Sequence, residues 1–195
     1  MNKKIAIVYF SAAGHTQLMA EKIAVGAESV AETEVAFVRV IGTDIVEGRY
    51  ANEALVASLA SADAVVFGTP TYMGGVSAQL KAFIDAMGGL WHTRALKDKI
   101  AGGFTHSSSP AGDKSSAIAF LHAYADQLGM LWVGAGEFPF YISGAKEQIN
   151  RTGFYAGAAG YGNGPYGSPA ALNEGDAKTA ELYGRRIAEI AHRLA

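Results

Sequence analysis

The sequence predicts an α/β domain in which helices cover both faces of a five-stranded parallel sheet. Short apolar runs, typical of buried strands, alternate with segments of helical period along most of the chain. Strands that alternate with helices form βαβ units, and these fit a doubly wound sheet with strand order 2-1-3-4-5. In that order a ligand binds at the carboxyl ends of the strands, beside strands 1 and 3.

Five apolar runs are the predicted strands. They are Ile5–Phe10, Glu34–Val40, Ala64–Gly68, Ile100–Thr105 and Leu131–Gly134. Two lysines precede the first run, but the run is too short for the apolar region of a signal peptide. No apolar stretch approaches the ~20 residues of a membrane span, so the sequence predicts neither feature.

Four segments place apolar or small residues at i, i+4, i+7, i+8 and i+11, which gives each helix one face for the sheet. The residues are Met19, Ile23, Gly26, Ala27 and Val30; Val76, Leu80, Phe83, Ile84 and Met87; Ala117, Leu121, Tyr124, Ala125 and Leu128; and Tyr183, Ile187, Ile190, Ala191 and Leu194. A weaker helix is expected near Asn52–Ala60.

The whole chain, residues 1–195, is predicted to be one domain, because it contains no linker and half of its residues are hydrophobic. The net charge of −2 leaves no basic surplus to neutralise phosphates, which argues against nucleic-acid binding. The absence of cysteine excludes disulfides, thiolate catalysis and iron–sulfur ligation, and no metal site is predicted. A chain without cysteine also fits a cytoplasmic protein.

Residues 137–173 are predicted to be a long insertion after or within strand 5. The segment is rich in Gly, Pro, Tyr and Phe and has no helical period. A loop of this length is usually functional or disordered. Its aromatic residues favour an ordered lid or a subunit contact, with a mobile surface loop as the alternative. They are Phe138, Phe140, Tyr141, Phe154, Tyr155, Tyr161 and Tyr166.

The first candidate binding loop leaves strand 1 and enters the first helix. A phosphate needs several donors and a positive potential, and the N–H groups at a helix N-terminus supply both. The predicted phosphate-binding residues are Ser11, Ala13, Gly14, His15 and Thr16. The alternative is an ordinary Ser/Thr-rich helix cap. The loop lacks both the Walker lysine and the G-x-G-x-x-G pattern, which points away from ATP, GTP and a Rossmann dinucleotide.

The second candidate loop follows strand 3, at the point where the strand order reverses. A flat heteroaromatic ring needs a flat apolar wall, with main-chain donors and acceptors at its edge. The predicted ring-binding residues are Pro70, Thr71, Tyr72, Met73 and Gly74. Proline stiffens the turn, the two larger side chains supply the wall, and glycine lets the backbone approach. The alternative is an ordinary Gly-Pro turn.

The third candidate loop follows strand 4 and is rich in serine. Such a loop can hydrogen-bond polar ring edges and ribityl hydroxyls. The predicted binding residues are His106, Ser107, Ser108, Ser109 and Gly112. The alternative is a solvated turn with Asp113 as the cap of a helix that begins near Lys114. Each loop is a weak signal alone, but three loops at the ends of strands 1, 3 and 4 predict a site for a phosphorylated flavin, FMN.

Several short motifs of the chain together carry a resemblance to a known family. They are Ser11-x-x-Gly14-His15, Thr69–Gly75, Phe83-Ile84-Asp85, Gly88-Gly89-Leu90-Trp91 and Gly164-Pro165-Tyr166-Gly167. Over nearly its whole length the chain resembles the WrbA-type NAD(P)H:quinone oxidoreductases, FMN proteins of the flavodoxin superfamily. The Gly-Gly-Leu-Trp run is the most specific motif, because ordinary flavodoxins lack it. The chain departs from the family in a short Val40–Asn52 segment, in Tyr72-Met73 for Arg-Phe, and in Gln127-Leu128-Gly129 for His-His-Gly.

The resemblance implies a flavodoxin-like fold, FMN as cofactor, NADH or NADPH as co-substrate and a quinone as acceptor. It also implies a homo-oligomer, a dimer or a tetramer, in which Trp91 lies near the flavin of a neighbouring subunit. The alternative for Trp91 is a place in the core, the usual environment of tryptophan.

Three functions remain open at this stage. The first is an FMN-dependent NAD(P)H:quinone oxidoreductase, the second a flavodoxin-type single-electron carrier, and the third a non-catalytic flavin-binding or regulatory module. The ring loops Pro70–Gly75 and His106–Gly112 contain no Asp or Glu, and the absence of nearby negative charge favours two-electron chemistry. Because the flavin performs the chemistry, no side chain is assigned as catalytic with certainty; Tyr72 and His106 are the candidates.

Overall fold

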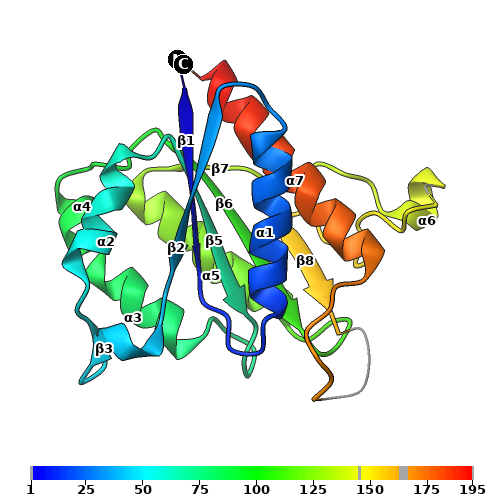
Figure 1. The fold of residues 1–195 in the computed structure, drawn as a ribbon, viewed down its shortest axis with the longest axis horizontal. Helices are drawn as coiled ribbons and strands as arrows, with labels where there is room; N and C mark the ends of the chain where they lie inside the picture. The colour runs from blue at the N-terminus through cyan, green and yellow to red at the C-terminus, as the bar shows by residue number, and fades with distance from the viewer. Residues whose placement is uncertain (1, 145, 163–166, 195) are drawn as a thin grey trace.

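The strand order of the sheet is the predicted one. The computed structural model describes residues 2–144, 146–162 and 167–194. Its main sheet runs β2-β1-β5-β6-β7, which is the order 2-1-3-4-5, and all of its pairings are parallel (Figure 1). The strands are β1 (Lys3–Tyr9), β2 (Thr33–Arg39), β5 (Ala64–Pro70), β6 (Ile100–Ser107) and β7 (Leu131–Trp132).

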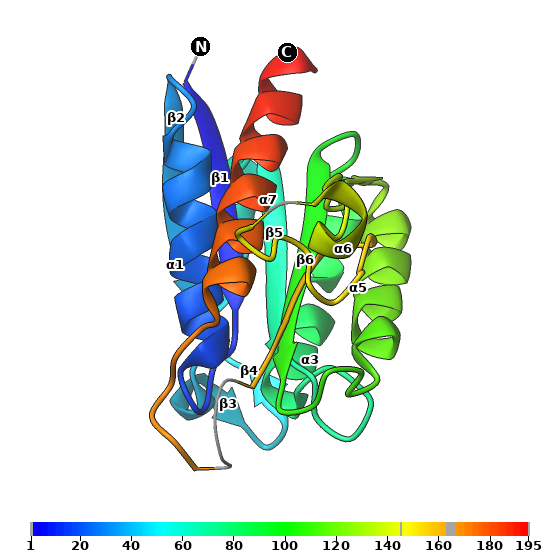
Figure 2. The ribbon, with the colours of Figure 1, turned by 90° about the vertical axis from the view of Figure 1, so that its right-hand side faces the viewer.

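Helices cover both faces of this sheet, as predicted. Figure 2 shows α1 (His15–Glu28) and α7 (Glu174–Arg193) on one side of the strands and α3 (Ala78–Ala86) and α5 (Lys114–Leu128) on the other. The weaker predicted helix is present as α2 (Glu53–Ser58), and the Gly-Gly-Leu-Trp run forms a separate short helix, α4 (Gly88–His92). In the described part of the chain, no helix is long and apolar enough to cross a membrane.

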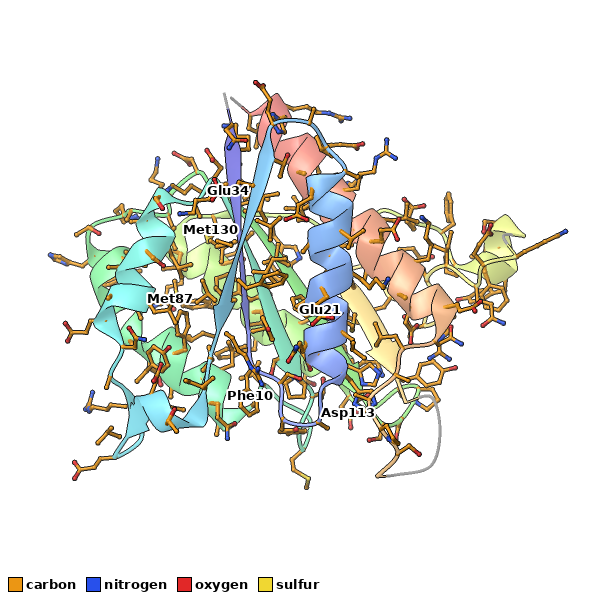
Figure 3. All side chains as sticks on the ribbon, viewed as in Figure 1. Phe10, Glu21, Glu34, Met87, Asp113 and Met130 are labelled. Atoms are coloured by element: carbon orange, nitrogen blue, oxygen red, sulfur yellow. The ribbon has the colours of Figure 1, made fainter. Side chains whose placement is uncertain are left out.

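The core has two layers because successive residues of a strand point to opposite faces of the sheet. In β1, Ile5 and Ile7 pack with α1 and α7, whereas Ala6 and Val8 pack with α3 and α5. All four are buried, which explains why the strand reads as a continuous apolar run instead of an alternating one. Side chains fill both spaces between sheet and helices, with Met87 and Met130 on the α3/α5 side (Figure 3).

The fifth strand is split into two short pieces. β7 pairs with the first part of β6 through Ile100 and Ala101, and β8 (Ala158–Tyr161) pairs with its last part through Phe104 to Ser107. The predicted insertion therefore lies within strand 5. Two details of the prediction were wrong: the strand expected at Leu131–Gly134 stops at Trp132, and the segment 137–173 contains a strand and a short helix, α6 (Phe140–Ser143).

A tyrosine from α7 fills the gap between the two pieces. Tyr183 is completely buried, and its hydroxyl donates to the carbonyl oxygen of Val133 at 2.7 Å. The hydroxyl oxygen of Tyr183 in turn accepts from the backbone N–H of Gly103 at 3.0 Å. Gly102 has no room for a side chain, since a Cβ there would lie 2.5 Å from this hydroxyl. A side chain thus takes the place of a missing ladder hydrogen bond.

Two strands are longer than predicted at their carboxyl ends. Thr69 and Pro70 are the last residues of β5, and His106 and Ser107 are the last residues of β6, where the sequence predicted loops. The extra length comes from pairing, because Pro70 lies opposite His106 and β8 continues the ladder to Ser107. A small antiparallel hairpin, β3 (Ile45–Val46) and β4 (Arg49–Tyr50), occupies the short segment after β2.

Candidate functional site

The three predicted loops meet around one cavity of about 550 Å³ at the carboxyl ends of β1, β5 and β6. Its lining residues are Ser11, Ala12, Ala13, His15, Thr16, Pro70, Thr71, Tyr72, His106, Ser107, Ser108, Gly162, Gly167, Ser168 and Pro169. In Figure 3, Phe10 and Asp113 mark this edge of the molecule, where β1 ends and α5 begins. The cavity therefore stands where a doubly wound sheet binds its ligands.

The first loop presents the start of α1 to the cavity. Gly14 precedes the helix with a φ of 97°, and no side chain caps the first turn. Its own N–H donates to the hydroxyl of Ser11 at 3.2 Å. The alternative of an ordinary Ser/Thr cap is therefore not what forms, and the uncapped N–H groups carry the positive end of the helix dipole. A Cβ on Gly14 would lie 2.8 Å from Ala170, so the residue lies against the end of the insertion.

The second loop is a tight turn held by β5 and β6. Thr71 donates its N–H to the carbonyl of His106 at 2.9 Å, which ties the loop to the neighbouring strand. Tyr72 and Gly75 exchange two backbone hydrogen bonds, and Met73 at the tip has a φ of 47°. Tyr72 lines the cavity, but Met73 is fully exposed at 105% and neither it nor Gly74 is among the lining residues.

Two histidines, His15 at the start of α1 and His106 near the end of β6, stack at one wall of the cavity. The ring centroids of His15 and His106 are 4.6 Å apart, with an angle of 15° between the ring planes. His106 is only 5% exposed, and in the described part of the chain its Nε2 has no hydrogen-bond partner. Burial, followed by the nearby charges of His15, Lys114 and Arg151, lowers the pKa of His106 to about 3. His106 is therefore neutral near pH 7 and is not suited to donate protons there.

A buried lysine donates hydrogen bonds to the third loop, at Ser107, Ser109 and Pro110. Lys114, the first residue of α5, is 3% exposed, and its Nζ donates to the hydroxyl of Ser107 at 2.9 Å. The same ammonium donates to the carbonyl oxygens of Ser109 at 2.8 Å and Pro110 at 2.7 Å. Burial lowers the pKa of Lys114 to about 8. Ser109 and Gly112, both predicted to bind ligand, do not line the cavity; the Ser109 carbonyl accepts from Lys114, and Gly112 packs against Ser107.

The insertion is anchored beside the cavity by a buried ion pair. Arg151 donates to Asp176 through Nε at 2.8 Å and Nη2 at 2.6 Å. The guanidinium also lies 3.5 Å from the centroid of the Tyr161 ring and donates to the Tyr161 carbonyl. Because Tyr161 precedes the lining residue Gly162, this pair positions one wall of the cavity.

Some lining residues were missed from the sequence. Gly162, Gly167, Ser168 and Pro169 come from the insertion, and Ala12 comes from the first loop. Only the length and aromatic content of the insertion hinted at the contribution of the first four, and neither feature names a residue. The resemblance motif at Gly164-Pro165-Tyr166, and Tyr166 as a lid aromatic, lie outside the described residues. Of the other predicted lid aromatics, Phe138, Tyr141 and Tyr155 are exposed and Phe154 packs on the core.

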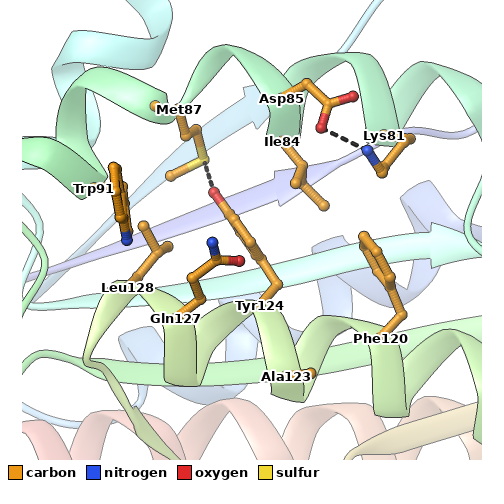
Figure 4. Close-up of a pocket in the computed structure, with 11 residues that line it drawn as sticks. Lys81, Ile84, Asp85, Met87, Trp91, Phe120, Ala123, Tyr124, Gln127 and Leu128 are labelled. Atoms are coloured by element: carbon orange, nitrogen blue, oxygen red, sulfur yellow. Dashed lines mark hydrogen bonds and ion pairs between the residues drawn. The ribbon is translucent and has the colours of Figure 1, made fainter.

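A second pocket, of about 340 Å³, lies between α3, α4 and α5 (Figure 4). Trp91 forms one wall and is 46% exposed, so it is not a core residue. The Tyr124 hydroxyl donates to the sulfur of Met87 at 2.8 Å across the pocket floor. Gln127 and Leu128, which replace the family's two histidines, also line it. None of the predicted cofactor-binding residues lies here.

Comparisons with known proteins agree on one family. The family model of NADPH-dependent FMN reductases matches residues 4–143. The flavodoxin FldP of Pseudomonas aeruginosa is 37% identical over 98% of both chains. An NAD(P)H dehydrogenase (quinone) of Geobacter sulfurreducens is 36% identical over 97% of this chain and 98% of its own. The crystal structure of a WrbA-like flavodoxin protein from Agrobacterium tumefaciens has a TM-score of 0.75 at 34% identity, with 100% of both chains covered.

Proposed function

Because this chain belongs to the NADPH-dependent FMN reductase family, we propose that it is an FMN-dependent NAD(P)H:quinone oxidoreductase. The resemblance to WrbA-type enzymes and the flavodoxin-like fold agree with the relatives and the solved structure. The observation that carries the proposal is the cavity at the ends of β1, β5 and β6, where an uncapped helix N-terminus meets two stacked histidines.

The residues at the phosphate end fit FMN. A phosphate dianion is stabilised by the N–H groups of a helix N-terminus, and the hydroxyls of Ser11 and Thr16 border the same space. The buried Nε2 of His106 is a polar atom that a phosphate oxygen or a ribityl hydroxyl would satisfy, since a buried polar group without a partner is costly. We propose that these groups, with His15, hold the phosphate and the ribityl chain.

The other end of the cavity suits the flavin ring. Pro70, Thr71 and Tyr72 come from a turn that two strands fix, which makes a rigid edge and wall. Tyr72 is half-exposed at the rim, and we propose that it stacks against the ring or against a substrate. When bound, FMN supplies hydride acceptance from NADH or NADPH and two-electron transfer to a quinone. The side chains bind and orient, and quinone protons come from water.

Replacing Thr16 with Ala is expected to weaken FMN binding by about tenfold or more. The change removes one hydroxyl donor to a charged group, an interaction of ~1.5–3 kcal/mol. Fluorescence titration of the apoprotein with FMN measures the dissociation constant. Riboflavin, which lacks the phosphate, should bind weakly to both proteins and show little difference between them. Thr93→Ala, outside the cavity, is the control; equal FMN affinity of wild type and Thr16→Ala would reject the phosphate assignment.

Turnover is the test of the function itself. Purified protein with FMN should oxidise NADH or NADPH with benzoquinone as acceptor. If both substrates used the same face of the bound flavin, nicotinamide would leave before quinone entered and the kinetics would be ping-pong. Parallel lines in a double-reciprocal plot are expected. Intersecting lines would mean that both substrates bind together, in a larger site than we propose.

A single-electron carrier is the second candidate, because the relative FldP is named a flavodoxin. Reductive titration separates the two functions. In the enzyme, the oxidised spectrum should pass directly to the two-electron-reduced one, because none of the described lining residues is acidic. A one-electron-reduced species that dominates at half reduction would favour the carrier.

We also propose that the chain is a single domain that forms a cytoplasmic homo-oligomer, a dimer or a tetramer. The half-exposed Trp91 beside the apolar pocket of Figure 4 supports a subunit contact on this face, since exposed apolar patches often mark interfaces. Light scattering after gel filtration measures the oligomer order, and a monomer for the wild-type protein would reject this proposal.

A further inference from the structure

Lys114 is in an unusual place for a lysine. A cation at the first residue of a helix opposes the helix dipole, and lysine is rarely buried without a carboxylate partner. Here all three ammonium protons are used, by one hydroxyl and two carbonyl oxygens of the loop Ser107–Pro110. The hydrogen bonds satisfy the donors but do not neutralise the charge. One of the acceptors, Ser107, lines the cavity, so the charge lies directly behind the cavity wall.

We propose that Lys114 is a positioning residue of the cofactor site, whose buried positive charge favours reduced, anionic FMN over oxidised FMN. The inference rests on the proposed function. Hydride transfer from the nicotinamide delivers two electrons and one proton, so the cofactor gains one negative charge. Two electrons and that proton then pass to the quinone, which takes its second proton from water. A fixed positive charge behind the Ser107 wall of the cavity stabilises the cofactor state that carries the extra negative charge, and it needs no movement to do so.

The surroundings of Lys114 keep this charge available near pH 7. The pKa of its ammonium is about 8, lowered mainly by burial. Asp176 from α7 and Asp113 before α5 raise it, whereas Arg151 from the insertion lowers it. The ring of Tyr161 from β8 lies 5.8 Å from Nζ, and His106 from β6 is neutral. Asp176 is already engaged by Arg151, so it offsets Lys114 only partly.

The first test compares the affinities of the two redox states. Lys114→Met in the FMN-loaded protein should weaken binding of reduced FMN relative to oxidised FMN by about tenfold, which lowers the two-electron midpoint potential by about 30 mV. Lys114→Arg, which keeps the charge, should restore much of the wild-type ratio of the affinities for reduced and oxidised FMN. Lys99→Met is the matched control. Lys99 is also partly buried and also donates to a carbonyl, but it precedes the other end of β6, about 25 Å away, and should leave the potential unchanged.

The second test uses only the wild-type protein. As pH rises from about 7 to about 10, Lys114 loses its proton, and reduced FMN, being more negative, delays that loss. Lys114 should therefore have a higher pKa beside reduced FMN than beside oxidised FMN. At pH values between these two pKa values, two-electron reduction should take up more than one proton. The slope of the midpoint potential against pH measures this uptake. A constant uptake of one proton overturns the proposal, as does a Lys114→Met potential equal to that of wild type. Failure of wild type to bind FMN would instead reject the proposed function.

Discussion

Asp176→Asn is expected to destabilise the protein by about 3–5 kcal/mol, because it leaves the Arg151 guanidinium buried without its counter-charge. Both side chains are nearly inaccessible, at 10% for Arg151 and 1% for Asp176. Their two short hydrogen bonds join the insertion to α7, and the Tyr161 N–H also donates to Asp176 at 3.2 Å. Asparagine keeps the shape but removes the charge and one acceptor. The substitution should therefore weaken both the ion pair with Arg151 and the attachment of the end of β8 to α7.

Denaturant unfolding of the two proteins measures this effect. Glu181→Gln on the same helix is the matched control, because it breaks the exposed Lys178–Glu181 pair and should cost about 0.5 kcal/mol or less. Limited proteolysis should cut the Asp176→Asn variant faster near the exposed Tyr155. FMN should bind more weakly, since Gly162 and its neighbours line the cavity. A variant as stable as the control would show that the pair contributes no net stability.

Tyr183→Phe should cost about 2–5 kcal/mol, a large effect for the loss of one oxygen. The hydroxyl serves two buried backbone groups, the N–H of Gly103 and the C=O of Val133. Each group left without a partner costs ~1–3 kcal/mol. Water has little access to replace the hydroxyl, because Tyr183 is completely buried between α7 and the sheet.

The control for this prediction is Tyr124→Phe. That hydroxyl donates to the sulfur of Met87, a weak acceptor, and its loss leaves no backbone group unpaired. Thermal or denaturant unfolding should separate the two variants by well over 1 kcal/mol. Hydrogen exchange at the Gly103 amide should accelerate in Tyr183→Phe and stay slow in Tyr124→Phe. Equal stabilities of Tyr183→Phe and Tyr124→Phe would mean that the backbone groups of Gly103 and Val133 find other partners when the Tyr183 hydroxyl is removed.

The sequence predicted the sheet order and the meeting of three loops because both follow from local signals. Apolar runs locate buried strands, and parallel strands bring their carboxyl ends to one edge. The strand Ala158–Tyr161 carried no such signal, since alanine and glycine favour strands poorly. It forms because Gly160 allows close packing: a Cβ there would lie 3.0 Å from His106 and 3.1 Å from Asp176. Tertiary fit, not propensity, sets this element.

In the site, too, local sequence patterns predicted some features, whereas tertiary packing determines the others. The first loop could be placed at the cavity because a strand–loop–helix entry is a recognisable local pattern. His15 and His106 were both named as candidates, although nothing in the sequence predicts their stacking. In the sequence, Lys114 marks only the expected start of a helix, and nothing there predicts its burial. Its burial results from the loop that folds back over it, and such closure is not encoded in spacing. Met73 was expected at the ring, but the tight turn points it outward.

The split fifth strand also affects which insertions the chain can accept during evolution. Each piece is held by its own pairing with β6, so the length of chain between β7 and β8 is not fixed by the ladder. The entropy of closing a loop grows only with the logarithm of its length, about 0.6 kcal/mol per doubling. Gly144 lies exposed in this segment with nothing near its Cβ position. A lineage, or an engineer, can lengthen the chain there and leave the sheet and its ligand edge as they are.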